Sequence, residues 1–370
     1  GAMRSSIDEM ARFVQFMLNR GQVGESQVIT DSLFDRLARP LSSLAAQSGI
    51  EYGYSFGVGP AHRNGAIWFG HGGAVPGFLS DYRYNPDADI GYVLLQNQFG
   101  IILYSDLYDT IQAALAPLVD SVEPPPAAAL TTEQLETYCG YYLPRSPRLQ
   151  ISAFGELLAG GLTVLTENDT LYTQGFMEDK DPLIPVSGNL FRRPGHPQAS
   201  RVFATTPDGR MVYASQGFYY ERTAFWKTLI HRILVFGAVI LMLSSMAYAL
   251  VWVPVHLYKR FTHNENRSKY LSMRVVPLLA VLSLILGIMP LSDSTLIEFG
   301  SFTLSTAIFF VSTLLFAGFS TLSVYTSYRS FFKPVKTVAR VYAVLLSTAC
   351  FGMTLYLGYW DVIGLRLWAY

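Results

Sequence analysis

The sequence predicts an α+β portion, built as an antiparallel sheet with flanking helices, followed by a small mostly-β domain and a four-helix transmembrane region. Three observations predict this class. Short runs of alternating apolar residues lie between segments of helical period in the first part of the chain. A second group of such runs follows a proline-rich stretch. Four long apolar stretches fill most of the remainder.

Two helices are expected at the start. Ser6 with Glu9 three residues later is a capping-box pattern, and apolar residues follow at helical spacing until Gly21. Thr30 begins a shorter helix that Pro40 ends. The first of these helices is expected to bury one face.

The pattern then changes to a period of two. Four runs rich in aromatic and β-branched residues, separated by Gly, Pro, Asn and Asp, predict an antiparallel meander: 52–59, 65–71, 78–85 and 90–98. Residues 103–118 return to a helical period, which predicts a helix lying across that sheet.

A proline-rich stretch marks a domain boundary. Three consecutive prolines within residues 119–130 favour a stiff, extended linker. Strand-like runs resume after it, including 149–155, and hairpin turns are expected at Asn168-Asp169 and Asp208-Gly209. The sequence therefore predicts four parts, with these bounds: 1–118, a linker 119–130, a small β domain 131–222, and a membrane domain 226–370.

The membrane domain is expected to cross the bilayer four times. Its apolar stretches each approach the ~20 residues that a crossing requires, at 229–253, 272–291, 301–324 and 338–360. The first and third connections are basic and the second is acidic, so the positive-inside rule places loops 254–271 and 325–337 in the cytoplasm. Residues 1–222 then lie in the periplasm or outside the cell, and the chain is an integral protein of the cell (inner) membrane. In this interpretation the basic residues are topological anchors rather than a ligand site.

Charge and cysteine content exclude several classes of function. Residues 1–222 carry 15 basic and 23 acidic residues, and residues 223–370 carry 12 and 4. Neither part has the dense basic patches of a nucleic-acid-binding protein. The two cysteines, Cys139 and Cys350, lie in very different surroundings, which argues against a disulfide framework. We expect no metal site and no cofactor.

One short motif points to chemistry. His71-Gly72-Gly73 follows an aromatic run, and consecutive glycines on a strand edge let a substrate approach the backbone closely. They also leave N–H groups free to bind an added strand or a developing oxyanion. An imidazole beside them is able to move protons near neutral pH. A solitary histidine in a glycine-rich turn is, however, more often structural.

The flanking residues support the catalytic interpretation. The ordered set "SSIDEMARFVQFMLNRG", "YGYSFGVG" and "FGHGGAVPGFLSDYRYNPDADIGYVLLQNQ" resembles the closing part of the serine β-lactamase and penicillin-binding-protein superfamily, in its class C-like branch. The resemblance covers about residues 4–118 and implies a partial β-lactamase/transpeptidase-like fold. It implies that His71 faces the substrate carboxylate or assists proton movement. Gly72 and Gly73 would then permit close substrate approach, and the backbone N–H of Ala74 would be an oxyanion donor.

The motifs that supply the family's nucleophile are missing. No Tyr-x-Asn occurs, and the one Ser-x-x-Lys, Ser330 to Lys333, lies in a basic loop between two apolar stretches, where we interpret it as coincidence. We therefore expect the chain to be the C-terminal piece of a longer hydrolase and to be inactive by itself. Residues 131–222 resemble, more loosely, the small β domain often appended to such hydrolases.

Two functions remain open on the sequence. One is a membrane-anchored serine hydrolase that forms an acyl-enzyme with amides or esters, such as D-amino-acid peptides, β-lactams or small esters. The other is a non-catalytic membrane receptor or assembly factor that uses the same shell to bind peptides. The expected partners are a small-molecule or peptide substrate and the lipid bilayer, with the oligomeric state open.

Overall fold

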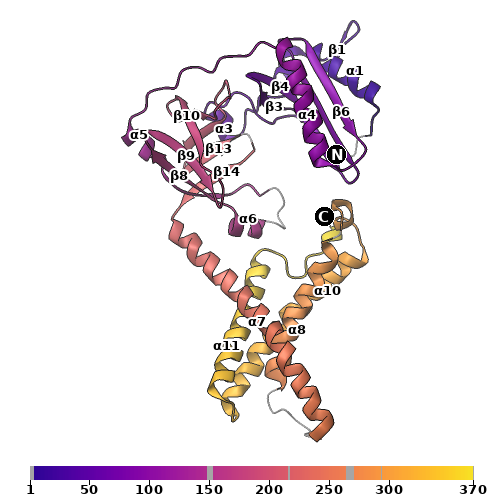
Figure 1. Cartoon of the computed structure of the whole chain (residues 1–370), viewed down its shortest axis with the longest axis vertical. Helices are drawn as coiled ribbons and strands as arrows, with labels where there is room; N and C mark the ends of the chain where they lie inside the picture. Colours follow the sequence, from indigo (N-terminus) through magenta and orange to yellow (C-terminus); the bar gives the residue numbers. More distant parts are fainter. Residues whose placement is uncertain (1–3, 148–152, 216, 264–270, 293, 370) are drawn as a thin grey trace. The chain divides into compact units, whose positions relative to one another are not determined.

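The structure, a computed structural model, describes residues 4–147, 153–215, 217–263, 271–292 and 294–369. These form two compact units (Figure 1). The first unit consists of residues 1–147 with 159–225, and the second of residues 148–158 with 226–370.

The first unit begins with short helices and a small hairpin. Their bounds are α1 (Ile7–Leu18), β1 (Gln22–Val23), β2 (Ser26–Gln27), α2 (Asp31–Asp35) and α3 (Leu44–Gln47). The predicted capping box of α1 is confirmed, because the Ser6 side chain accepts from the Glu9 N–H while the Glu9 carboxylate accepts from the Ser6 N–H. Val14 and Met17 are buried on one face of this helix.

A four-stranded antiparallel sheet follows, in the order β3-β4-β5-β6. Its strands are β3 (Gly59–Arg63), β4 (Ala66–Val75), β5 (Phe78–Asn85) and β6 (Ile90–Gln96). The meander is therefore confirmed, except that its first strand lies later than expected. The run 52–59 contributes only Gly59, because residues 53–58 fold back on themselves, with the Ser55 N–H donating to the Val58 carbonyl.

Helices lie against both faces of this sheet. On one face, the Phe13 ring of α1 meets the Tyr82 ring edge-on at 5.3 Å, and Gly91 leaves room for Val14. On the other face lies α4 (Ile101–Leu115), followed by the 3₁₀ turn η1 (Ala116–Leu118). The Tyr104 hydroxyl of α4 donates to the Ser80 carbonyl at 3.1 Å. Successive strand residues alternate between these two faces.

The larger β structure is a closed barrel of eight strands, in the order β10-β11-β12-β13-β14-β7-β8-β9. All its pairings are antiparallel, and β14 closes it against β7. A core of aromatic and aliphatic side chains fills it, including the buried Tyr142, Phe191 and Phe203. The short helix α5 (Thr132–Glu136) precedes it. The strands are β7 (Gly140–Pro144), β8 (Leu162–Glu167), β9 (Thr170–Gly175), β10 (Asp181–Ser187), β11 (Leu190–Arg192), β12 (Arg201–Thr205), β13 (Met211–Ser215) and β14 (Tyr219–Thr223).

The predicted fold class is therefore wrong. A partial β-lactamase/transpeptidase-like α+β fold, built as an antiparallel sheet with flanking helices, was expected, followed by a small mostly-β domain and a four-helix transmembrane region. The structure instead has a closed antiparallel barrel of eight strands and a C-terminal helical region. Closure depends on the pairing of Tyr141 with Thr223. A two-residue period gives the faces of each strand but does not reveal a pairing so distant in the sequence.

The predicted turns within the barrel are confirmed. Asn168 and Asp169 both have positive φ values, of 48° and 57°, in the hairpin between β8 and β9. Gly209 has a φ of 82° in the turn between β12 and β13. The strand expected at 149–155 lies partly outside the described residues, and its last three residues belong instead to the helix α6 (Ala153–Ala159).

The sheet and the barrel meet inside the first unit. The His62 ring of β3 stacks on the His196 ring from the loop between β11 and β12, with centroids 4.3 Å apart. The proline-rich segment also binds both parts, because the Val122 N–H donates to the Gly65 carbonyl and the Ala128 N–H donates to the Pro185 carbonyl. Residues 119–130 are thus extended and held by hydrogen bonds at both ends.

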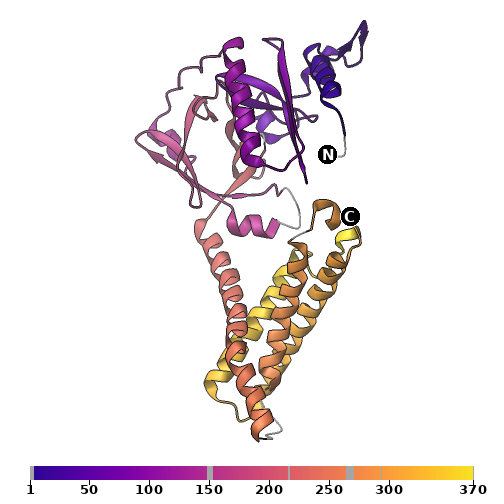
Figure 2. The same ribbon diagram turned by 45° about the vertical axis from the view of Figure 1, so that its right-hand side comes forward.

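The second unit is helical (Figure 2). Among the described residues, four helices are long and apolar enough to cross a membrane: Phe225–Thr262, Leu271–Leu291, Leu304–Phe332 and Thr337–Tyr359. A shared core joins them, including Met242, Ala280, Phe316 and Cys350. The elements are α7 (Phe225–His263), α8 (Leu271–Ile288), η3 (Met289–Leu291), α9 (Leu296–Phe299), α10 (Leu304–Arg329), η4 (Ser330–Phe332), α11 (Thr337–Tyr359) and η5 (Leu367–Ala369).

Candidate functional site

The glycine motif lies in the second half of β4. His71, Gly73 and Ala74 are exposed, and Gly72 is half-buried. The aromatic run before the motif is anchored, because Trp68 is buried beneath α4 with only 2% of its surface exposed. The first half of β4 is therefore part of the core, whereas the second half extends to the surface.

Two tight turns determine which way the backbone of β4 points. Asn64-Gly65 joins β3 to β4 with positive φ values of 50° and 77°, and Pro76-Gly77 joins β4 to β5 with a φ of 85° at the glycine. Two-residue turns close a hairpin on a hydrogen-bonded pair, and such pairs then alternate along an antiparallel ladder. Both turns give the same result. The backbone groups of His71 and Gly73 point toward β5, and those of Gly72 and Ala74 point toward the β3 side.

The β3 side is open at the motif. β3 pairs with β4 only from Arg63 opposite Ala66 to Gly59 opposite Gly70. Within the described part of the chain, no strand pairs with β4 beyond Gly70 on this side, and no hydrogen bond involves the N–H of Gly72 or Ala74. These two N–H groups therefore point away from β5 toward a sheet edge that has no partner strand, where an added strand or an anion is able to accept from them.

Side chains gather beside this edge on the face that carries His71. The Tyr54 ring lies 5.4 Å from the imidazole, centroid to centroid. Gly73 pairs with Ser80, and a Cβ at Gly73 would lie 2.5 Å from the Ser80 Oγ. Only glycine therefore fits at position 73 with the serine in its present place. His71 pairs with Tyr82, whose pKa burial raises to about 12, so the phenol stays protonated at neutral pH.

Exposed apolar side chains continue this face. Val75 and Phe78 flank the turn between β4 and β5 and are 43% and 58% exposed, and Tyr54 is 53% exposed. Scattered exposed apolar residues need no explanation, but these three adjoin a strand edge with free hydrogen-bonding groups. Such an arrangement suits an extended ligand, whose backbone pairs with the edge while its side chains contact the apolar surface.

A buried polar network supports the opposite face. Asp81 forms an ion pair with Arg83 at 3.0 Å and accepts from the Tyr92 hydroxyl at 3.1 Å. Gln112 of α4 donates to the same hydroxyl at 3.0 Å. Burial raises the pKa of the Asp81 carboxyl, and the Arg83 guanidinium opposes that shift. These groups fix β5 against α4 on the face opposite His71, and His71 is still close enough to act electrostatically on the Asp81 carboxyl.

The sequence predicts the four motif residues as site residues but does not point to Tyr54 and Ser80. The signal for Ser80 was present, because a two-residue Pro76-Gly77 turn fixes the register and so pairs Gly73 with Ser80. No sequence pattern indicated Tyr54, because the alternating residues of 52–59 predict a strand whereas residues 53–58 fold back on themselves.

The described residues include no cluster arranged to hold a metal ion, and the serine of the Ser-x-x-Lys match is buried. No group of three His, Cys, Asp or Glu side chains among them is arranged to hold a metal ion. Ser330 belongs to the second unit and is fully buried at the end of α10. Its burial fits the interpretation of Ser330-Phe-Phe-Lys333 as a coincidental match.

Comparisons with known proteins give structural matches only. No family model and no curated protein matches the chain. Among solved structures, it is similar to SurE with D-Leu (17% identity, TM-score 0.35) and to SurE (19%, 0.34), covering 59% of this chain and 50% and 48% of those chains. It is also similar to the octameric penicillin-binding protein homologue from Pyrococcus abyssi, at 13% identity and a TM-score of 0.22, over 59% of this chain and 47% of that one. The chain thus spans about half the length of these structures, and scores so low carry no conclusion about fold or activity.

Proposed function

We propose that the β4 edge is the substrate-binding wall of an acyl-transfer site, carried by a protein anchored in the cell membrane with residues 1–222 outside the cytoplasm. One observation carries the proposal: Gly72 and Ala74 present free N–H groups at an open strand edge beside the exposed imidazole of His71. The ordered motifs that resemble the serine β-lactamase and penicillin-binding-protein superfamily support it.

Each residue has a physical role in this proposal. Acyl transfer places negative charge on a carbonyl oxygen, and backbone N–H groups aimed at that oxygen stabilise it. The Ala74 N–H serves as such a donor, and the Gly72 groups pair with the substrate backbone. Gly73 keeps the approach clear, and His71 binds a carboxylate or moves a proton.

The substrates proposed are those with an acyl carbonyl in an extended chain, namely peptides with D-amino acids, β-lactams and small esters. We assign no nucleophile to this chain. If the protein is instead a receptor, the same edge binds the peptide without cleaving it. The hydrolase and the receptor therefore differ in whether the bound ligand is consumed.

The test uses Ala74→Pro, because proline lacks the N–H that would serve the oxyanion. The substitution is compatible with the strand, since this N–H faces the open edge and is not required for pairing with β5. Ala74→Ser keeps the N–H and is the matched control. A fluorescent N-acylated D-alanyl-D-alanine peptide measures binding to the membrane-embedded protein, and its cleavage and that of p-nitrophenyl acetate measure turnover.

When the chain is joined to a segment that supplies a Ser-x-x-Lys nucleophile, hydrolase function predicts turnover that falls about 10²- to 10³-fold in Ala74→Pro, the usual effect of losing one oxyanion donor, and little in Ala74→Ser. Binding without cleavage by that longer protein would contradict the hydrolase and favour the receptor. Absence of peptide binding would contradict both.

A further inference from the structure

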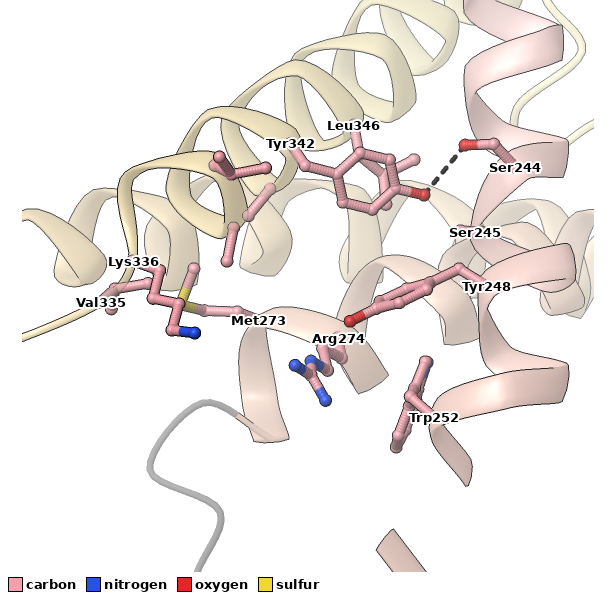
Figure 3. A pocket seen from close by; sticks show the side chains of 13 residues that line it. Ser244, Ser245, Tyr248, Trp252, Met273, Arg274, Val335, Lys336, Tyr342 and Leu346 are labelled. Atoms are coloured by element: carbon pink, nitrogen blue, oxygen red, sulfur yellow. Dashed lines mark hydrogen bonds between the residues drawn. The ribbon is translucent and has the colours of Figure 1, made fainter. Parts of the chain in front are cut away.

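We propose that the helical unit holds a binding site for an anionic phospholipid between α7, α8 and α11. A cavity of about 590 Å³ lies there (Figure 3). Ligand cavities usually measure roughly 300–1,000 Å³, so this one is large enough for a headgroup with part of its chains. The site goes beyond the acyl-transfer proposal and does not depend on it.

The cationic side of the cavity is built around Arg274. Its guanidinium lies 5.4 Å from the Tyr248 ring centroid and 5.8 Å from that of Trp252, both within the range of cation–π attraction. Among the described residues, no carboxylate pairs with it. The rings hold the charge in position while its hydrogen-bond donors stay available. Lys336 is exposed and lines the same cavity, so the cavity has two positively charged side chains in its wall.

The remaining lining is mostly apolar. Met273, Ala343 and Leu346 are buried around the cavity. Ser244 and Tyr342 also line it, and their hydroxyl groups satisfy each other at 2.9 Å. A free anion would leave this apolar surface in contact with water. A lipid fills both parts, because its phosphate meets the cations while its chain covers the apolar wall.

The position along the helices suits a headgroup. Arg274 lies in the first turn of α8, which begins at Leu271, and Lys336 immediately precedes α11, which begins at Thr337. In a chain with four spans, the starts of the second and fourth helices lie on the same side of the bilayer. Both charges therefore lie at one membrane interface, where basic pockets between helices bind anionic headgroups. A topological anchor needs neither the aromatic rings nor the shared cavity.

The experiment measures lipid binding by the delipidated full chain in a neutral detergent, using native mass spectrometry. The probes are phosphatidylglycerol, phosphatidylcholine and soluble glycerol 3-phosphate. The test variant is Arg274→Gln with Lys336→Gln. The matched control is Arg260→Gln with Lys333→Gln, which removes the same charges from exposed residues outside the cavity.

We expect phosphatidylglycerol to bind more tightly than phosphatidylcholine, and glycerol 3-phosphate not to compete. The test variant should bind phosphatidylglycerol about 30-fold more weakly, since each basic residue near a surface contributes roughly one kcal/mol. The control should change little. Ala339→Trp, which fills the cavity without changing its charge, should also lose the lipid. Circular dichroism verifies that each variant keeps its helices.

Three results would overturn the proposal. Equal weakening in the test and control variants would show unspecific attraction to surface charge. Equal affinity for the two lipids would remove the headgroup preference. Competition by glycerol 3-phosphate as strong as that by phosphatidylglycerol would identify a soluble anion as the ligand.

Discussion

Acidification should weaken the junction between β3 and the barrel. Burial lowers the pKa of His62 from 6.5 to about 4, with Arg201 and Arg63 adding repulsion. Burial likewise lowers the pKa of His196 to about 4. Electrostatic repulsion from His62, Arg201 and Arg193 lowers it further, each by less than burial does. The Nδ1 atoms of both rings are buried and have no hydrogen-bond partner among the described residues. Both imidazoles are therefore neutral in the folded chain at physiological pH.

The sign and size of the effect follow from these values. Between pH 6.5 and pH 4 the unfolded chain binds protons that the folded chain does not, so stability is full above pH 6.5 and is lost as the pH falls. At pH 5 each histidine costs at most about 2 kcal/mol, because the pH is then about 1.5 units below the unfolded pKa. The rings are only partly buried, so solvent screening reduces the sum for the pair to about 2 kcal/mol.

Urea titration of the full chain in detergent, read by pulse proteolysis of the first unit, measures this loss. At a typical urea dependence of about 2 kcal/mol per molar, the midpoint should fall by about 1 M between pH 7.5 and pH 5. His62→Gln combined with His196→Gln should remove most of that shift. The reasoning is refuted if the wild-type midpoint is the same at both pH values, or if the double variant keeps the wild-type shift.

Two further predictions concern the sheet. Gly91→Ala should lower the free energy of unfolding by about 1–3 kcal/mol, because the new Cβ would lie 2.3 Å from Val14 Cγ1 and 3.0 Å from the Arg83 carbonyl oxygen; an unchanged urea midpoint would contradict it. Asp81→Ala should cost about 3 kcal/mol, since it leaves the Arg83 guanidinium half-buried without its carboxylate, and recovery of stability in Asp81→Ala with Arg83→Met would verify that cause.

Local sequence patterns were sufficient to predict the features that depend only on neighbouring residues. The capping box at Ser6, the hairpin turn at Asn168 and the four apolar helices depend on neighbouring residues, and all are found in the structure. The period of two also identified β5 with its correct ends, Phe78–Asn85.

Features that depend on distant pairing were not predictable in the same way. Apolar residues alternate with a period of two in a closed barrel and in an open sheet alike. The period therefore did not predict the pairing of β14 with β7. At the candidate site, the sequence identified His71 and its glycines but not the stacking of Tyr54 on the imidazole. The fold positions the four motif residues at the edge of β4. Their roles remain predictions.

Residue-resolved hydrogen exchange on β4 tests the central claim most directly. In the free protein, the amides of Gly72 and Ala74 should exchange much faster than those of His71 and Gly73, because only the N–H groups of His71 and Gly73 point toward β5. Adding an N-acylated D-alanyl-D-alanine peptide should slow exchange at Gly72 and Ala74 and leave His71 and Gly73 unchanged. Slow exchange at Gly72 and Ala74 without peptide, or no protection at saturating peptide, would contradict the account.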